Sequence, residues 1–280
     1  MATVRIPSSD GVVLSVHDLG GRGPEIVMAH ATGFHGRVWE PLAAALTGFH
    51  CWGIDLRAHG DSLLTDGARL EWEAFADDIL AVVDALELDR PFGVGHSKGG
   101  AALVLAEERR PGTFEALWLY EPVIMPPAMI TDAASTENPL SEGARRRRPT
   151  FASRDEAFEN FAGKQPFSAL DPGALRAYVD HGFSDQPDGS VTLKCRPEHE
   201  ARVYAMGSTH RASLGLAEVL CPVTVAVGHS STFGPTTFAD AIVAGLPQGH
   251  RQDFGDLGHF GPMEDPPSVA RGIRQAFAGL

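Results

Sequence analysis

The stretch of the chain that decides its fold is Phe92-Gly93-Val94-Gly95-His96-Ser97-Lys98-Gly99-Gly100, followed by the apolar run Ala101-Ala102-Leu103-Val104-Leu105-Ala106. The residues before Ser97 are typical of a short buried strand, and those after it favour a helix. A chain that turns so abruptly from strand to helix needs residues without side chains, which Gly95 and Gly99 provide. Ser97 then projects from the turn, surrounded by the amides at the start of the helix.

This glycine-serine pattern is by itself weak evidence for a nucleophile, because short patterns also arise by chance. The alternative is an ordinary surface serine at a glycine-rich corner between a strand and a helix. The rest of the sequence must therefore supply what a nucleophilic serine needs. These groups are a base, an acid that orients the base, and donors for an oxyanion.

The composition argues against several classes of function. The chain has 280 residues, of which 43% are hydrophobic and 21% charged, as expected of a globular protein with one large core or a core plus a lid. Its net charge of −13 argues against nucleic acid or an anionic membrane as a partner. No run is apolar enough to span a bilayer, and the N-terminus lacks the long apolar segment of a signal peptide.

Cysteine and histidine usage points to a cytoplasmic protein without a metal. Cys51, Cys195 and Cys221 are odd in number and lack the spacing of metal ligands, so we expect free thiols in a reducing cytoplasm. None of the 12 histidines belongs to a recognised metal-binding motif. We therefore predict that the protein binds no metal.

One basic segment stands out against the acidic background. Arg145-Arg146-Arg147-Arg148 lies between Pro139 and Pro149. We interpret it as a solvated, mobile surface loop, because runs of like charge repel one another and stay in water. The alternative is an anion contact at the rim of a site.

Short apolar runs alternate with helical patterns over much of the chain. Helices are predicted over residues 72–88, 98–109 and 266–278. Strands are predicted over residues 12–19, 25–30, 50–55, 92–95, 116–120, 223–227 and 251–254. This alternation indicates an α/β fold with a mostly parallel sheet covered by helices on both faces. Loops at the carboxyl ends of such strands build the site, and Ser97 lies in one of them.

The alternation stops between residues 123 and 218, where no clear strand is seen. Helices are predicted after the capping box at Ser153, after Asp171-Pro172 and over residues 197–206. We therefore divide the chain into a core of residues 1–122 and 219–280 and a helical lid of residues 123–218. We expect some phenylalanines of the lid to line an apolar pocket and most to form its own core; they are Phe151, Phe158, Phe161, Phe167 and Phe183.

The best candidate for the base is His259, in Asp256-Leu257-Gly258-His259-Phe260-Gly261-Pro262. This segment follows the last predicted strand and precedes the last helix, so it lies at the same edge of the sheet as Ser97. The alternative is a loop histidine with a local hydrogen bond. His96 adjoins Ser97, but its side chain should point away from the serine, so we interpret it as structural.

Two backbone amides are expected to bind the oxyanion. One belongs to Lys98, the residue after the nucleophile. The other belongs to the loop His30-Ala31-Thr32-Gly33-Phe34, whose small residues suit a backbone donor. We choose Thr32 for this second amide, with Phe34 as the substitute. The alternative is a plain loop between a strand and a helix.

Taken together, these segments resemble those of the α/β-hydrolase fold superfamily. The matching segments appear in the family's order and spacing; they are HATGFHGRVW from His30, DLRAHGDS from Asp55, GHSKGG from Gly95 and GHFGPMEDP from Gly258. The resemblance covers most of the chain outside the lid. It implies an eight-stranded sheet, a nucleophile elbow at Ser97, a triad histidine at His259 and no cofactor. Ala31 replaces the glycine that is usual after the first histidine.

The acid of the triad departs from the family's common pattern. That acid often follows the strand after the lid as Gly-x-x-Asp, but here the segment is Gly228-His229-Ser230-Ser231. Some members, including lactone hydrolases resembling zearalenone lactonase, place a glutamate after an earlier strand. Glu121 stands there, at the end of an apolar strand where a carboxylate needs a partner such as His259. Asp256 is the second choice and Asp240 the third. The alternative role for Glu121 is a strand-end carboxylate bonded to a lid amide.

A serine nucleophile indicates acyl transfer through an acyl-enzyme. We therefore expect a hydrolase of a small apolar carboxylic ester or lactone. The same triad would also serve a carbon-carbon bond hydrolase or a thioesterase, and the fold also serves small-molecule receptors without turnover. The sequence leaves open whether the protein forms a homo-oligomer.

Overall fold

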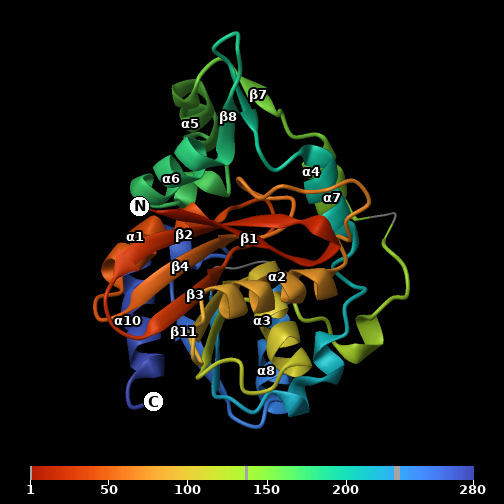
Figure 1. The fold of residues 1–280 in the computed structure, drawn as a ribbon, viewed down its shortest axis with the longest axis vertical. Coiled ribbons are helices and arrows are strands. Elements are labelled where there is room, and N and C mark those ends of the chain that lie inside the picture. Colours follow the sequence, from red (N-terminus) through yellow and green to blue (C-terminus); the bar gives the residue numbers. More distant parts are fainter. Residues whose placement is uncertain (1, 136–137, 230–233) are drawn as a thin grey trace.

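The computed structural model describes residues 2–135, 138–229 and 234–280 (Figure 1). Its main element is an eight-stranded sheet in the order β1-β2-β4-β3-β5-β6-β10-β11. These strands are β1 (Thr3–Pro7), β2 (Val13–Gly21), β3 (Glu25–Ala29), β4 (His50–Asp55), β5 (Phe92–His96), β6 (Leu117–Tyr120), β10 (Val223–Gly228) and β11 (Gly249–Phe254). β2 pairs antiparallel with both β1 and β4, and the other strand pairs of this sheet are parallel. The expected mostly parallel, eight-stranded sheet is thus confirmed.

Helices cover both faces of the sheet (Figure 1). One hydrophobic core includes buried residues of α2 (Trp72–Ala85), α3 (Lys98–Arg109) and α8 (Gly234–Gly245). The other includes buried residues of α1 (Glu40–Ala45), α9 (Gly261–Glu264) and α10 (Pro266–Phe277). Short 3-10 helices join the elements, at Ser9–Gly11, Gly36–Trp39, Pro127–Met129, Phe167–Ala169, Ala212–Leu214 and Leu216–Glu218. The strand β1 was not predicted because only Ile6 of its residues is buried, so it lacks an apolar pattern.

The α-helices and short strands of the segment between β6 and β10, which we call the insertion (residues 123–218), lie above the sheet (Figure 1). Its last residues leave this layer, because Ala212 and Leu216 are buried in the core with α2, α3 and α8. Its helices are α4 (Pro139–Arg145), α5 (Arg154–Ala162), α6 (Pro172–Gly182) and α7 (Pro197–Ala205). It also contains a three-stranded antiparallel sheet of β7 (Thr150–Phe151), β9 (Val191–Leu193) and β8 (Phe183–Asp185). The expectation of no strand here is therefore wrong. Strands of two or three residues are too short to show an alternating pattern.

Two helices of the insertion, α5 and α6, begin where the sequence predicts. Ser153 accepts a hydrogen bond from the N–H of Glu156, whose carboxylate accepts in turn from the N–H of Ala152. The carboxylate of Asp171 accepts from the N–H groups of Gly173 and Ala174 at the start of α6. These bonds satisfy amides that have no partner inside the helix.

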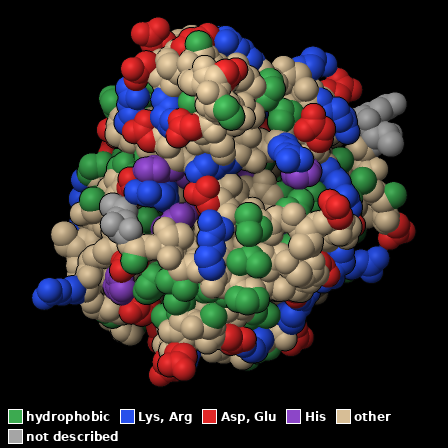
Figure 2. Space-filling model, turned by 45° about the horizontal axis from the view of Figure 1, so that its top comes forward, with side chains coloured by type: hydrophobic (Ala, Val, Ile, Leu, Met, Phe, Trp, Pro, Cys, Tyr) green, Lys and Arg blue, Asp and Glu red, His purple; other side chains and the backbone are tan. Residues whose placement is uncertain are grey.

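Three of the four arginines are exposed, as expected from the sequence, but the run is not a single loop and Arg147 departs from the expectation. Arg145 ends α4, and the side chain of Arg147 is only 18% exposed because it pairs with Glu200. On the face drawn in Figure 2, basic side chains of the insertion lie among acidic ones and do not form one patch. Arg147 thus contacts an anion, but the anion is a carboxylate of the protein itself.

None of the helices within the described ranges is both long and apolar enough to cross a membrane. Cys51, Cys195 and Cys221 are free thiols in the interior, and burial raises the pKa of each. Among residues 2–135, 138–229 and 234–280, no group of three or more His, Cys, Asp or Glu side chains could hold a metal ion.

Candidate active site

Ser97 occupies the turn between β5 and α3 with φ 54° and ψ −119°. A residue other than glycine rarely adopts this backbone conformation, and such strain is concentrated at functional sites. The turn is crowded on both sides. A Cβ at position 95 would lie 2.7 Å from the Cα of Gly100, and one at position 99 would lie 2.1 Å from the carbonyl oxygen of Ala29. Glycine is therefore required at both positions.

Glu121 follows β6, the neighbour of β5, and it too has a positive φ, of 40°. Its side chain is fully buried, and its carboxylate is nonetheless well bonded. Oε1 accepts hydrogen bonds from the N–H of Gly228 at 3.1 Å and from the hydroxyl of Thr236 at 2.9 Å. Oε2 lies 2.7 Å from Nδ1 of His259. The end of β10, where the family's common acid would stand, thus supplies a donor to Glu121.

The contact between Glu121 and His259 fixes the state of the histidine. A carboxylate oxygen can only accept, so Nδ1 of His259 carries the proton in this bond. Nε2 is then left to take a proton from an alcohol, as the base of a serine triad does. Burial of the Glu121 carboxylate also suits this role, because the attraction between a carboxylate and an imidazolium is stronger away from water.

The backbone around His259 is held by side chains. Glu264 accepts hydrogen bonds from the N–H groups of Gly258 at 2.7 Å and Phe260 at 3.2 Å. The hydroxyl of Tyr120 donates to the carbonyl of Gly258 at 2.7 Å. Because these bonds hold the residues on either side of His259 in place, they fix the position from which its ring extends.

His96 serves this same loop. Its Nε2 lies 2.7 Å from the carbonyl oxygen of His259, so Nε2 must be the donor. Burial, followed by the nearby His259, lowers the pKa of His96 well below its usual value, so the ring is neutral. The bond directs His96 to the backbone of the loop and away from chemistry, in line with the structural role expected from the sequence.

The two other candidate acids lie elsewhere. Asp256 is exposed, and no hydrogen bond or ion pair joins it to His259 in the described part of the chain. Asp240 is on α8 and pairs with Arg251 at 2.6 Å on the surface. Of the segment Gly228-His229-Ser230-Ser231, the two serines lie outside the described residues.

Ser97, His259 and Thr32 face one cavity of about 660 Å³. Its described lining contains no Asp, Glu, Lys or Arg. The lining is mostly apolar; it includes Trp72, Val123, Met125, Met129, Pro139, Leu140, Phe238 and Phe260. None of the five phenylalanines of the insertion lines this cavity, because they pack against one another in a core instead. The expectation that some of them would line the pocket is therefore wrong.

The loop after β3, residues 30–35, which we call the β3 loop, borders the cavity through Ala31 and Thr32. Within the described residues, no protein acceptor pairs with the N–H of Thr32 or with that of Lys98. The N–H of Phe34, the substitute candidate, already donates to the carbonyl of Ala31 at 3.2 Å. His30 fixes the start of the loop, because its Nδ1 donates to Ala31 and its Nε2 accepts from the N–H of Leu56.

The side chain of Lys98 takes no part in the cavity. It is fully buried, with Nζ 4.1 Å above the ring of Phe75 and no hydrogen-bond partner among the described residues. Burial lowers the pKa of this amine to about 7. Lys98 can therefore offer its amide to an oxyanion, while its amine points into the core.

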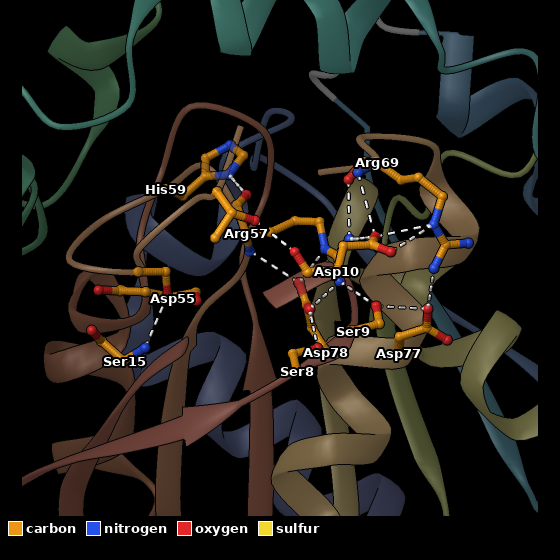
Figure 3. A network of polar contacts seen from close by, with 12 residues as sticks. Ser8, Ser9, Asp10, Ser15, Asp55, Arg57, His59, Arg69, Asp77 and Asp78 are labelled. Carbon is orange, nitrogen blue, oxygen red and sulfur yellow. Dashed lines mark hydrogen bonds and ion pairs between the residues drawn. The ribbon is translucent and has the colours of Figure 1, made fainter. Parts of the chain in front are cut away.

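The segment DLRAHGDS from Asp55 forms a network that stabilises the loop after β4 (Figure 3). Asp55 accepts hydrogen bonds from His17 and from the N–H of Gly36, which ties β2 and the start of the next helix to β4. Arg57 is fully buried and pairs with Asp78 of α2 at 2.7 Å. No role was expected for these residues from the sequence, where the signal was the three charged residues Asp55, Arg57 and Asp61 within one family motif.

Residues 26–271 match the model of the alpha/beta hydrolase family, so the chain belongs to this family. Over 271 residues, 93% of this chain and 89% of the relative, it is 26% identical to a 2-hydroxy-6-oxononadienedioate/2-hydroxy-6-oxononatrienedioate hydrolase from Paraburkholderia xenovorans (strain LB400). It is 33% identical to monoglyceride lipase from Homo sapiens over 109 residues, 36% of this chain. That match spans only 35% of the lipase.

Solved structures share the fold. The crystal structure of E-2-(acetamidomethylene)succinate hydrolase superposes with a TM-score of 0.80 and 21% identity, over 98% of each chain. A likeness at this identity establishes the architecture and leaves the substrate open.

Proposed function

We propose that the protein is a serine hydrolase of carboxylic esters or lactones, in which Ser97 is the nucleophile, His259 the base and Glu121 the acid. The observation that carries the proposal is the 2.7 Å contact between Glu121 and Nδ1 of His259, beside a strained Ser97 that faces the same cavity as His259. This arrangement matches the roles of a nucleophile, a base and an orienting acid.

The reaction follows from these roles. The hydroxyl oxygen of Ser97 attacks the carbonyl carbon while its proton passes to Nε2 of His259, and Glu121 stabilises the imidazolium. The N–H groups of Thr32 and Lys98 hold the oxyanion of the tetrahedral intermediate. His259 then gives its proton to the leaving alcohol, which leaves an acyl group on Ser97. Water, activated by the same histidine, releases the acid.

The lining of the cavity supports an uncharged substrate. The names of two compared hydrolases, a dioate hydrolase and a succinate hydrolase, refer to substrates with two carboxylates. A carboxylate buried without a cationic partner costs several kcal/mol. Because the described lining has no Lys or Arg, we propose an ester or lactone whose acyl part is apolar and neutral.

Two esters with acyl chains of equal length test this proposal. We expect kcat/KM for p-nitrophenyl hexanoate to exceed that for the mono-p-nitrophenyl ester of adipic acid by roughly 100-fold, because only the latter carries a carboxylate. Ser97→Ala should lower turnover of the neutral ester by about 10⁴-fold or more.

Circular dichroism and the melting temperature control for folding in the Ser97→Ala variant. A panel of lactones, thioesters and ring-cleavage diketones separates the competing reactions. Turnover of a diketone or a thioester without any turnover of esters would replace the proposal by a carbon-carbon hydrolase or a thioesterase. Full ester hydrolysis by Ser97→Ala would reject the triad.

A further inference from the structure

Three side chains of the insertion meet beside the β3 loop. Arg147 lies between α4 and β7, Tyr178 in α6 and Glu200 in α7. Nη1 of Arg147 donates to Oε2 of Glu200 at 2.6 Å, and Nη2 donates to the hydroxyl of Tyr178 at 2.5 Å. Glu200 and Tyr178 are 4% and 1% exposed, so the carboxylate and the phenol are both removed from water. No residue of this group lines the cavity described above.

The carboxylate of this group packs directly on the β3 loop. Gly33 has a φ of 81°, and a Cβ built on it would lie 2.4 Å from Oε1 of Glu200 and 3.3 Å from Nη1 of Arg147. Position 33 must therefore be glycine to let the ion pair approach. Because Gly33 follows Thr32, the ion pair lies next to the peptide that would bind the oxyanion.

Tyr178 holds the other end of the same loop. Its ring centroid lies 5.1 Å from that of Phe34, and its carbonyl accepts a hydrogen bond from Nε2 of His35 at 3.1 Å. The insertion thus contacts three successive residues of the β3 loop, of which the last two are held by Tyr178. The shape of the loop depends on contacts from outside the core.

The charges of this group bear on catalysis. A buried carboxylate beside Gly33 would repel the negative charge that develops on a substrate oxygen at the neighbouring amide. Arg147 balances that charge at a distance of 2.6 Å. Burial lowers the pKa of Arg147, but Tyr178 and Glu200 outweigh burial and raise it, so the guanidinium stays charged.

We propose that Arg147 is a positioning residue that acts through Glu200. It neutralises the carboxylate that packs on Gly33, so that the amide of Thr32 can hold an oxyanion. This inference rests on the proposed ester hydrolysis and adds a residue to its machinery. The oxyanion forms only after substrate is bound, so Arg147 affects kcat far more than KM.

Arg147→Met and Glu200→Gln separate charge from shape. Arg147→Met leaves the carboxylate unbalanced, and we expect kcat for p-nitrophenyl hexanoate to fall roughly 10- to 100-fold, with KM within about threefold. Glu200→Gln keeps the shape and removes the negative charge, so its kcat should stay within about threefold of the parent protein. Arg148→Met is the matched control, because Arg148 is 55% exposed and pairs with Glu156.

An oxyanion mimic provides the readout that a purely structural role would not move. Trifluoromethyl pentyl ketone forms a tetrahedral oxyanion adduct with an active serine, whereas the matching alcohol cannot. We expect Arg147→Met to weaken inhibition by the ketone as much as it lowers kcat, and to leave inhibition by the alcohol unchanged. Arg148→Met should change neither.

Equal losses in Arg147→Met and Glu200→Gln would overturn the inference, and so would a folded Arg147→Met with parental kcat and ketone affinity. If Arg147→Met fails to unfold cooperatively, the double variant with Glu200→Gln takes its place. No unbalanced charge remains there, so a loss of kcat beyond tenfold would overturn the charge role, and a smaller one supports it. Absence of both ester turnover and ketone adduct in the parent protein would reject the proposed function itself, and this inference with it.

Discussion

The core and the insertion each contain a buried pair of an arginine and a carboxylate, and we infer that the two pairs have different roles. In the core, Arg57 and Asp78 lie 2.7 Å apart and are both fully buried (Figure 3). In the insertion, Arg147 and Glu200 lie 2.6 Å apart and are 18% and 5% exposed.

Their surroundings explain the difference. Arg57 also bonds Ser9 and Asp10, so it joins the loop after β4 to the N-terminal segment and α2. The partner of Arg147 instead touches the β3 loop beside the cavity. The same chemistry thus contributes to stability in one region and, as we infer, to rate in the other.

The largest effect is expected at Glu121, a third buried carboxylate, which lies in the candidate active site. Glu121→Gln should lower kcat by roughly 10³- to 10⁴-fold, because an amide in this place favours the wrong tautomer of His259. The melting temperature should change little, since Gln keeps an oxygen for Gly228 and Thr236. Steady-state kinetics and calorimetry measure both, and a loss of kcat under about fivefold would move the acid role away from Glu121.

The next effect sharpens the contrast between the two arginines. Arg57→Met leaves Asp78 buried without its cation, so the free energy of unfolding should drop by about 3–5 kcal/mol. Activity per folded molecule should stay near the parental value. Denaturant unfolding and kcat measured on the same sample decide this.

Arg69→Met is the control for this pair. Arg69 is 50% exposed and pairs with Asp10 and Asp77, so its removal should cost less than about 1 kcal/mol. If Arg57→Met lost activity at unchanged stability, the division of labour between the two regions would be wrong.

The smallest effect concerns the amine of Lys98, and it has the opposite sign. Burial lowers its pKa from 10.5 to about 7, so at pH 7 and below the folded state carries a penalty for the charged amine. Lys98→Met should therefore raise the free energy of unfolding near pH 7, by about 2 kcal/mol.

The pH dependence of that gain follows from proton binding. Between pH 7 and 10.5 the unfolded parent binds more protons at Lys98 than the folded parent does, so parental stability at this group rises with pH. Unfolding curves at a series of pH values should show the advantage of Lys98→Met shrinking over this range. An advantage that grew with pH would contradict burial of an unpaired amine.

The sequence revealed more of the core than of the insertion, for a physical reason. Ser97 and Glu121 stand directly after buried strands, and His259 lies in the loop after β11, so local patterns place all three at one edge of the sheet. The positive φ values of Ser97 and Glu121 could not be predicted, because they depend on neighbouring strands.

The contacts of the insertion come from residues that are distant in the sequence. Arg147, Tyr178 and Glu200 belong to three separate elements, and no periodicity links them. A run of like charge predicts that all of its members are solvated. Arg146 and Arg148 are indeed exposed, but nothing in the run marks Arg147 as the member that finds a buried partner. The direction of the Lys98 side chain depends on packing in the same way.

The central claim is that Ser97 is the nucleophile. Intact-mass spectrometry after incubation with a fluorophosphonate, followed by peptide mapping, tests it directly. The account predicts a single adduct on Ser97, absent in Ser97→Ala and formed far more slowly in His259→Ala. An adduct of equal yield in Ser97→Ala, or no adduct on the parent protein, would contradict it.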